Sequence, residues 1–156
     1  MGVEFVAETK LKVFIAYVDE ESEKALKLYD AFTAAGLDPW LDKRKLLPGQ
    51  NWPRCIEQAI TISDFFVPCF SRLTLRKRSH FHYEVRHALD CTRRMPLDDV
   101  FIMPVRLDAC VLPKRIAGHI QYVDMFPDWD EGFEKILSSI AAEARLRAKR
   151  RSEILF

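Results

Sequence analysis

The chain has 156 residues, a length that fits one domain with its own hydrophobic core. Apolar residues make up 49% of it and charged residues 30%, which is ordinary globular composition and argues against disorder. The net charge of +1 gives no electrostatic case for direct binding to nucleic acid.

The sequence also lacks the signals of membrane insertion and secretion. No apolar run approaches the roughly 20 residues that span a bilayer, so we expect no membrane partner. Residues 1–12 contain no apolar segment of the kind that a signal peptide carries. The four cysteines are widely spaced and form no CxxC motif, which favours free thiols in a reducing compartment. We therefore expect a cytoplasmic protein.

The first part of the chain alternates short apolar runs with a helical pattern. Residues 12–17 predict a buried strand, and Asp19 or Ser22 can cap the helix that follows. Gly36 is a natural end for that helix, because glycine adopts the left-handed conformation that often terminates one. Residues 37–41 predict a second short strand.

A basic loop over residues 42–51 leads to the middle of the chain. Pro53 suits the first turn of the next helix, where the N–H that proline lacks would be unpaired anyway. Residues 65–70 predict a third strand. A second basic loop at residues 76–78 precedes a helix expected over residues 80–93.

Two more strands and a helix are expected in the last part. Residues 100–107 predict a fourth strand and residues 120–125 a weaker fifth, and the last helix begins near Asp128 or Asp130. Alternating strands and helices predict an α/β protein with a parallel sheet covered on both faces. Pro68 lies within the third strand and another proline within the fourth, so we expect local bulges there.

We divide the chain into three parts. Residues 1–11 are expected to be an N-terminal extension, and residues 12–142 form the domain. Residues 143–156 are a basic helix end or a linker to a missing module.

Five segments, in order along the chain, resemble the boxes of one known family. They are Val13-Phe14-Ile15-Ala16-Tyr17, Trp40-Leu41-Asp42 with Leu46 to Trp52, Ser63 to Ser71, Glu84 to Leu89, and Phe101 to Leu107. By this resemblance the chain is identified as a bacterial-type Toll/interleukin-1 receptor (TIR) domain protein over roughly residues 12–140. Each segment alone is a weak signal, but five in the family order are specific.

The resemblance implies a fold and a function. The fold is a flavodoxin-like three-layer sandwich with a five-stranded parallel sheet in the order 2-1-3-4-5. The function is cleavage of NAD+ to nicotinamide and linear or cyclic ADP-ribose, activated by homotypic TIR–TIR assembly in bacterial immune defence or signalling. NAD+ is then a substrate and no cofactor is expected. A fused or separate sensor module is a further implied partner.

Glu84 is the candidate catalytic residue. It lies near the start of its helix and borders the apolar stripe that includes Phe81 and Ala88. Ligands of an open parallel sheet bind at the carboxyl ends of the strands, where the order reverses. Cleavage of a glycosidic bond develops positive charge on the ribose, which a carboxylate stabilises. The alternative is a helix-capping acid paired with a base such as Arg78.

The resemblance also implies binding residues. The substrate site would include Ala16, Tyr17, Asp42, Trp52, His80 and Phe81, and the assembly loop would include Leu46, Leu47, Pro48 and Gly49. Two positions depart from the family pattern, which has a serine where Ala16 stands and often a tryptophan where His80 stands. Core packing is the alternative role for Trp52 and Phe81, and a turn-forming role is the alternative for Asp42.

Other functions remain as hypotheses. A TIR scaffold that assembles without catalysis would not need Glu84, and a nucleoside deoxyribosyltransferase-like enzyme would break the same type of bond. A phosphoacceptor receiver domain is rejected, because the third strand ends without an acceptor aspartate. His80, Glu84 and His87 share a helix face, but no nearby Cys or Asp completes a metal site, so none is predicted.

Overall fold

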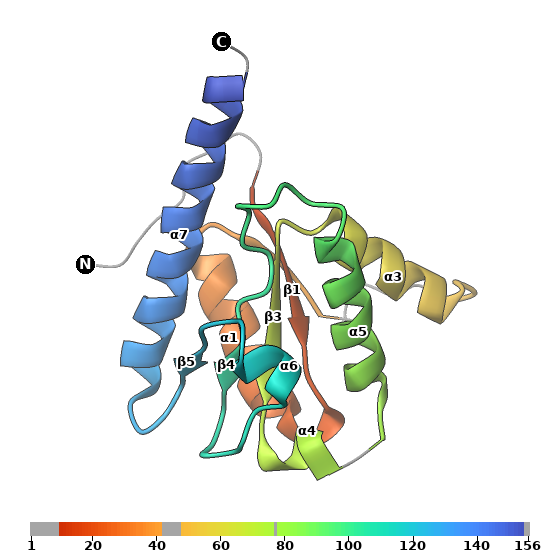
Figure 1. Ribbon diagram of the computed structural model, residues 1–156. Helices are drawn as coiled ribbons and strands as arrows, with labels where there is room; N and C mark the ends of the chain where they lie inside the picture. The colour runs from red at the N-terminus through yellow and green to blue at the C-terminus, as the bar shows by residue number, and fades with distance from the viewer. Residues whose placement is uncertain (1–9, 42–47, 77, 155–156) are drawn as a thin grey trace.

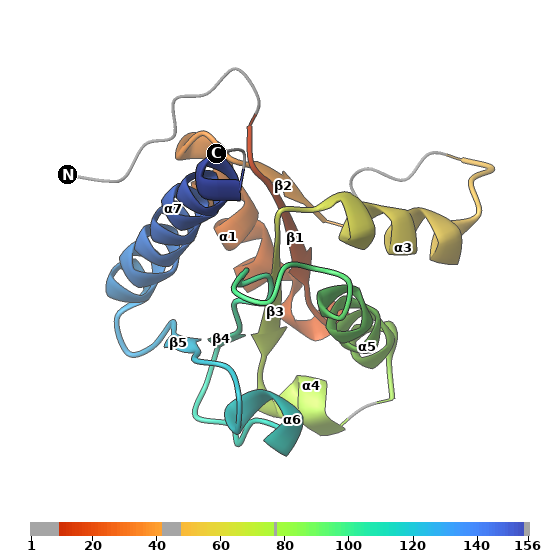
Figure 2. The ribbon, with the colours of Figure 1, turned by 45° about the horizontal axis from the view of Figure 1, so that its top comes forward.

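The computed structural model describes residues 10–41, 48–76 and 78–154. Its centre is a five-stranded parallel sheet in the order β2-β1-β3-β4-β5. Helices cover both faces of the sheet, with α1 and α7 on one side and α3 and α5 on the other (Figures 1 and 2). The predicted α/β class, the three layers and the strand order are therefore confirmed.

The strands are short and alternate with helices along the chain. The strands are β1 (Lys12–Ala16), β2 (Asp38–Trp40), β3 (Phe65–Phe70), β4 (Val105–Arg106) and β5 (Val123–Asp124). The helices are α1 (Ser22–Ala34), α3 (Trp52–Ile62), α4 (Arg72–Arg76), α5 (His80–Thr92), α6 (Lys114–Ala117) and α7 (Trp129–Ile154), and a 3-10 turn, η1 (Asp19–Glu21), precedes α1.

The alternation of side chains along β1 divides the core in two. Val13 and Ile15 belong to a cluster with buried residues of α1 and α7. Phe14 and Ala16 point to the other face and pack with buried residues of α3 and α5. Successive side chains of a strand point to opposite faces, so a run of buried residues predicts a strand covered on both sides.

The ends of α1 match the sequence only in part. Helix α1 begins at Ser22, so Ser22 is its first helical residue and does not cap it. The N-cap residue is Glu21, whose side chain makes no capping hydrogen bond. At the other end Gly36 has φ of +93°, and its N–H donates to the carbonyl of Thr33 at 3.1 Å. Leu37 N–H reaches back to Phe32 at 3.0 Å, which completes the Schellman motif that glycine permits.

Pro68 in β3 lies level with Pro104, just before β4. The sheet keeps one register on both sides of this level. The flanking pairs are Phe66–Ile102 and Cys69–Val105. Because an inserted residue would shift the register, the predicted bulges are wrong. The sheet instead omits ladder hydrogen bonds here, since proline has no N–H to donate.

The last two strands are short beside these missing ladder hydrogen bonds. The run predicted as one strand over residues 100–107 is regular only at Val105–Arg106, and the fifth strand pairs only at Val123–Asp124. The basic loop expected at residues 76–78 begins inside the short helix α4, which was not predicted and whose last residue is Arg76. Lys77 lies outside the described residues.

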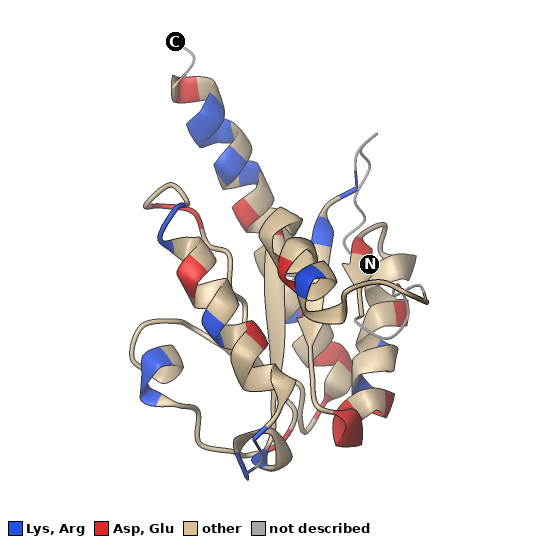
Figure 3. Ribbon diagram, turned by 90° about the vertical axis from the view of Figure 1, so that its right-hand side faces the viewer, with Lys and Arg blue, Asp and Glu red and all other residues tan. Residues whose placement is uncertain are grey.

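The last helix begins as predicted and runs further. The N–H of Glu131 donates to Asp128 Oδ1 at 3.2 Å, which caps α7. The expected domain boundary at residue 142 falls inside this helix, and Glu143 and Arg147 beyond it are buried. Lys and Arg residues, blue on the ribbon, are concentrated along its last turns (Figure 3). None of the helices in the described part of the chain has the length and apolar character needed to cross a bilayer.

Candidate functional site

A small cavity lies where the N-terminal turns of α3 and α5 meet. Its volume is about 230 Å³. The lining residues are Trp52, Pro53, Ile56, His80, Tyr83 and Glu84. Helix α5 begins close to α4, which follows the carboxyl end of β3 (Figure 1), so the cavity lies toward the edge of the sheet where ligands of open α/β folds bind.

Polar contacts hold α3 against α5 along their length. Tyr83, which lines the cavity, donates a hydrogen bond from its Oη to Glu57 of α3, the residue after Ile56. Further along, Thr61 Oγ1 and His87 Nε2 lie 3.1 Å apart. These contacts fix the distance between the two helices, and therefore the width of the cavity between their first turns.

The carboxylate of Glu84 belongs to this cavity. The residue is only 2% exposed, and its neighbours Phe81, Val85 and Ala88 on α5 are part of the core. Burial of a carboxylate costs free energy unless polar or charged groups compensate it. Glu84 lies one turn after the N-terminus of α5, where the positive end of the helix dipole favours the ionised form.

Two rings form an aromatic wall beside this carboxylate. Trp52 and His80 meet edge to face, with ring centroids 4.1 Å apart and an interplanar angle of 77°. Trp52 comes from the first turn of α3, which Asn51 caps by accepting a hydrogen bond from the N–H of Arg54 at 3.2 Å. The aromatic surface is thus built by two helices.

The structure brings the predicted catalytic residue, Glu84, together with two of the predicted substrate residues, Trp52 and His80. Ala16 is fully buried in the core on the same face of the sheet, and Phe81 packs edge to face against Phe70 with centroids 5.2 Å apart. For Phe81 the core alternative therefore matches the structure.

Tyr17 belongs to the core cluster on the opposite face, with residues of α1 and α7. It is not among the residues that line the cavity between α3 and α5.

The loop that was predicted to mediate assembly is described in part. Pro48 and Gly49 form an exposed turn in which Gly49 has φ of +85°, a value that glycine adopts without strain. Leu46 and Leu47 lie outside the described residues, as does the predicted substrate residue Asp42.

Three lining residues were not identified as site residues from the sequence. Tyr83 directly precedes Glu84, Pro53 follows Trp52, and Ile56 is a buried residue of α3 that also belongs to the core. The available signal was that the first turns of both helices carry aromatic side chains, which suggests that they face one another.

The described residues, 10–41, 48–76 and 78–154, form no metal-binding cluster. No group of three or more His, Cys, Asp or Glu side chains there is placed to hold an ion. The four cysteines are free, and Cys69 and Cys110 are buried. Burial raises the pKa of the Cys69 thiol to about 12, so it stays protonated at neutral pH and is not a nucleophile.

Comparison with known proteins adds a family match. Residues 13–137 match the model of the TIR domain. The fold is similar to that of the TIR domain of the Toll-related Receptor TRR-2 from Hydra magnipapillata, with a TM-score of 0.67 and 20% identity, covering 83% of this chain and 97% of that one. The chain matches no curated protein.

Two further solved structures share the fold. A metazoan TIR-STING receptor from C. gigas, in complex with 2',3'-cGAMP, has a TM-score of 0.69 and 21% identity, covering 89% of this chain and 42% of that one. The CMP N-glycosidase BcmB from Clostridium botulinum has a TM-score of 0.57 and 18% identity, covering 80% of this chain and 96% of that one.

Proposed function

Because the chain belongs to the TIR domain family, we propose that it is an NAD+ glycohydrolase. It cleaves the nicotinamide–ribose bond and releases nicotinamide together with linear or cyclic ADP-ribose. The observation that carries this proposal is the buried carboxylate of Glu84, which lines a cavity together with the rings of Trp52 and His80.

The chemistry needs one carboxylate. As the bond breaks, positive charge develops on the ribose, as in other glycoside cleavages. A carboxylate placed at that charge stabilises the transition state more than the ground state, and its effect is large where water is excluded. Nicotinamide leaves as a neutral molecule, so the enzyme needs no general acid, and Glu84 acts alone to stabilise the cation and hold the ribose hydroxyls.

The cavity suits part of the substrate. Its volume of about 230 Å³ is below the range of about 300 to 1,000 Å³ that is typical of complete ligand pockets. We therefore assign the nicotinamide end of NAD+ to the cavity and the adenosine end to the surface outside it. The rings of Trp52 and His80 offer an aromatic contact for nicotinamide.

A structural neighbour supports this class of chemistry. The Clostridium botulinum protein with the same fold is named as a CMP N-glycosidase, so a related fold serves the cleavage of an N-glycosidic bond. We propose that self-assembly activates the present enzyme and that it acts in immune defence or signalling in the cytoplasm.

The test is a product assay with a matched pair of variants. Concentrated protein is incubated with NAD+, with and without a crowding agent, and products are separated by chromatography. We expect Glu84→Gln to reduce nicotinamide release by about 100-fold or more, as removal of one transition-state-stabilising group does elsewhere. Glu134→Gln is the control, because Glu134 is an exposed carboxylate of α7, which packs on the opposite face of the sheet from the cavity.

The same assay addresses the scaffold hypothesis. A non-catalytic scaffold would release no nicotinamide from protein that light scattering shows to be assembled, and that result would overturn the enzyme proposal. Equal activity of wild-type protein and Glu84→Gln would overturn the role of Glu84. Nucleosides tested beside NAD+ separate a deoxyribosyltransferase-like activity from NAD+ cleavage.

A further inference from the structure

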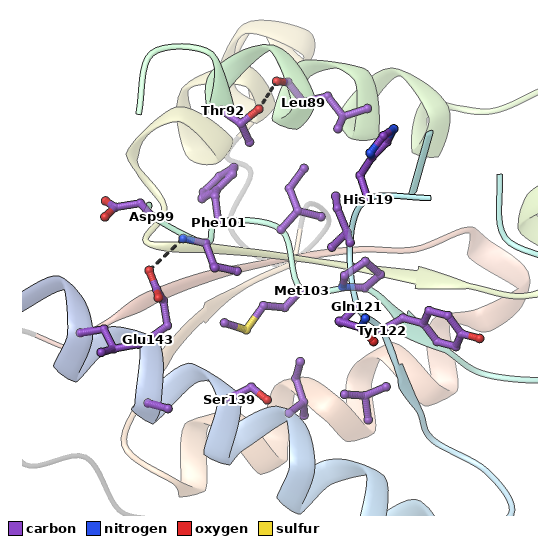
Figure 4. A pocket seen from close by; sticks show the side chains of 18 residues that line it. Leu89, Thr92, Asp99, Phe101, Met103, His119, Gln121, Tyr122, Ser139 and Glu143 are labelled. Carbon is purple, nitrogen blue, oxygen red and sulfur yellow. Dashed lines mark hydrogen bonds between the residues drawn. The ribbon is translucent and has the colours of Figure 1, made fainter. Parts of the chain in front are cut away.

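A second and larger cavity lies at the edge of the sheet between α5 and α7 (Figure 4). Its volume is about 620 Å³, within the range of about 300 to 1,000 Å³ that is typical of small-molecule sites. It shares no lining residue with the cavity of Glu84. A ligand here would therefore be independent of the proposed NAD+ cleavage.

The walls of this cavity are mostly apolar. Leu89 on α5 lies above it and Ser139 on α7 below it, with Phe101 and Met103 between them (Figure 4). Three of the large apolar side chains that the described surface leaves exposed also belong to this lining: Val100, Tyr122 and Leu146. Exposed apolar residues gathered around a cavity are a feature of binding sites.

The strand segment before β4 forms one side of the cavity. The N–H of Val100 donates to Glu143 at 2.8 Å, and its carbonyl accepts from Arg147 at 2.5 Å. Pro104 has no N–H, and its carbonyl accepts from Val123 at 3.0 Å. At both ends of the segment the backbone groups on this side are therefore already used or missing.

Ile102 lies between these two residues. The carbonyl of Phe101 and the N–H of Met103 bond to Phe66 of β3, so strand alternation turns the N–H and C=O of Ile102 the other way, toward the cavity. Neither group has a hydrogen bond to another described residue. The register of β4 and β5 would place Ile120 opposite, but the Ile120 N–H donates to Ile116 at 2.9 Å.

We propose that this cavity binds a small planar molecule that joins an apolar ring to an adjacent N–H and C=O, as an aromatic lactam does. The ring packs between Phe101 and Met103, and the N–H and C=O pair with the carbonyl and amide of Ile102. A peptide that bound here as an added strand would need further backbone hydrogen bonds along this edge. Val100 and Pro104 cannot supply them, because their backbone groups on this side are already bonded or, for the N–H of proline, missing.

The test uses quinolin-2(1H)-one as the probe and its N-methyl analogue as the matched control. Titration into ¹⁵N-labelled protein, followed by amide chemical shifts, is expected to give saturable binding with the largest shift at Ile102. The N-methyl analogue should bind at least about tenfold more weakly, because it cannot donate to the buried carbonyl of Ile102.

Two variants test the location. Ser139→Trp places a large ring in the cavity, whereas Ser138→Trp changes the neighbouring exposed residue of α7, which does not line it. We expect Ser139→Trp to weaken binding by tenfold or more and Ser138→Trp to leave it within about twofold. The comparison of the lactam with its N-methyl analogue uses wild-type protein, so it stands even if one of the two variants fails to fold.

Three results would overturn the proposal. They are no saturable shift at Ile102 up to the solubility limit of the lactam, equal affinity for the lactam and its N-methyl analogue, or unchanged binding in folded Ser139→Trp. None of these depends on NAD+, so this proposal and the enzyme proposal fail separately.

Discussion

Trp52 and His80 meet edge to face across two helices, beside the buried carboxylate of Glu84. The TIR-like pattern often has tryptophan where His80 stands, and the aromatic surface here comes instead from the first turn of α3. A ring from a distant part of the chain thus occupies the wall beside the carboxylate.

Removal of the Trp52 ring tests this wall. We expect Trp52→Ala to lower kcat/KM for NAD+ by about tenfold, which corresponds to the loss of one aromatic contact. Trp52→Phe should retain most of the activity, because it keeps an aromatic face. Unchanged kcat/KM in Trp52→Ala, measured on folded protein, would show that the ring does not contact the substrate.

The turn at Pro48 tests assembly. Proline fixes the backbone just before Gly49, whose φ of +85° shapes the exposed turn. We expect Pro48→His to weaken self-association and to lower NAD+ cleavage at a given protein concentration, while Glu84→Gln leaves association unchanged. Sedimentation velocity over a concentration series measures self-association, and nicotinamide release at the same protein concentrations measures cleavage. Pro96→His, at another exposed proline, is the control, and equal effects of the two changes would argue against this loop.

The C-terminal half of α7 is held by a buried ion network. Arg147 pairs with Glu143 at 3.2 Å, donates to the carbonyl of Asp64 at 2.8 Å and lies over the Phe65 ring at 4.4 Å. Because removal of one partner leaves buried groups uncompensated, we expect Arg147→Met to lower the free energy of unfolding by about 3 to 5 kcal/mol.

Urea denaturation measures this loss. Arg151→Met, at an exposed arginine in the last turn of the same helix, is the control and should change stability by less than about 0.5 kcal/mol. Similar effects of the two substitutions would mean that the network contributes no more than a surface charge.

The pair of Arg106 and Asp124 makes stability depend on pH. The hydrogen bond from Arg106 lowers the pKa of Asp124 below its ordinary value of 3.8, although partial burial opposes the shift. A lowered pKa in the folded state stabilises the protein above the unfolded value and loses that effect as pH falls through the folded pKa.

We therefore expect Asp124→Asn to be less stable than wild type at pH 7, with a difference that shrinks below about pH 4. Denaturation of both proteins between pH 7 and pH 3 measures it. A difference that stays constant over this range would mean that the charge of Asp124 contributes nothing.

Much of the fold follows from local sequence. The buried runs of β1 and β3 and the end of α1 at Gly36 are set by residue type and spacing, so they were predicted correctly. The break at Pro68 and Pro104 was not, because it depends on the register between two strands that are distant in sequence. The buried position of Arg147 was also missed, since a basic helix end looks solvated until its partners in other segments are known.

The site was predictable to a similar degree. The helical stripe placed Glu84 at the border of the core, and the structure places it at a cavity. The approach of Trp52 to His80 depends on how α3 packs against α5, which no local pattern specifies. The catalytic role of Glu84 stays a prediction.

The two facing prolines divide the sheet into units that can open separately. Strands β1, β2 and β3 are joined by continuous pairing, whereas β4 and β5 join them through a short ladder and one isolated bridge. Native-state hydrogen exchange should therefore detect two cooperative units, with the amides of β4 and β5 exchanging through a smaller opening than those of β3. Local opening of β4 and β5 would change the walls of the larger cavity, to which Val123 of β5 and the segment before β4 contribute, and would leave the packing of α3 against α5 around Glu84 intact.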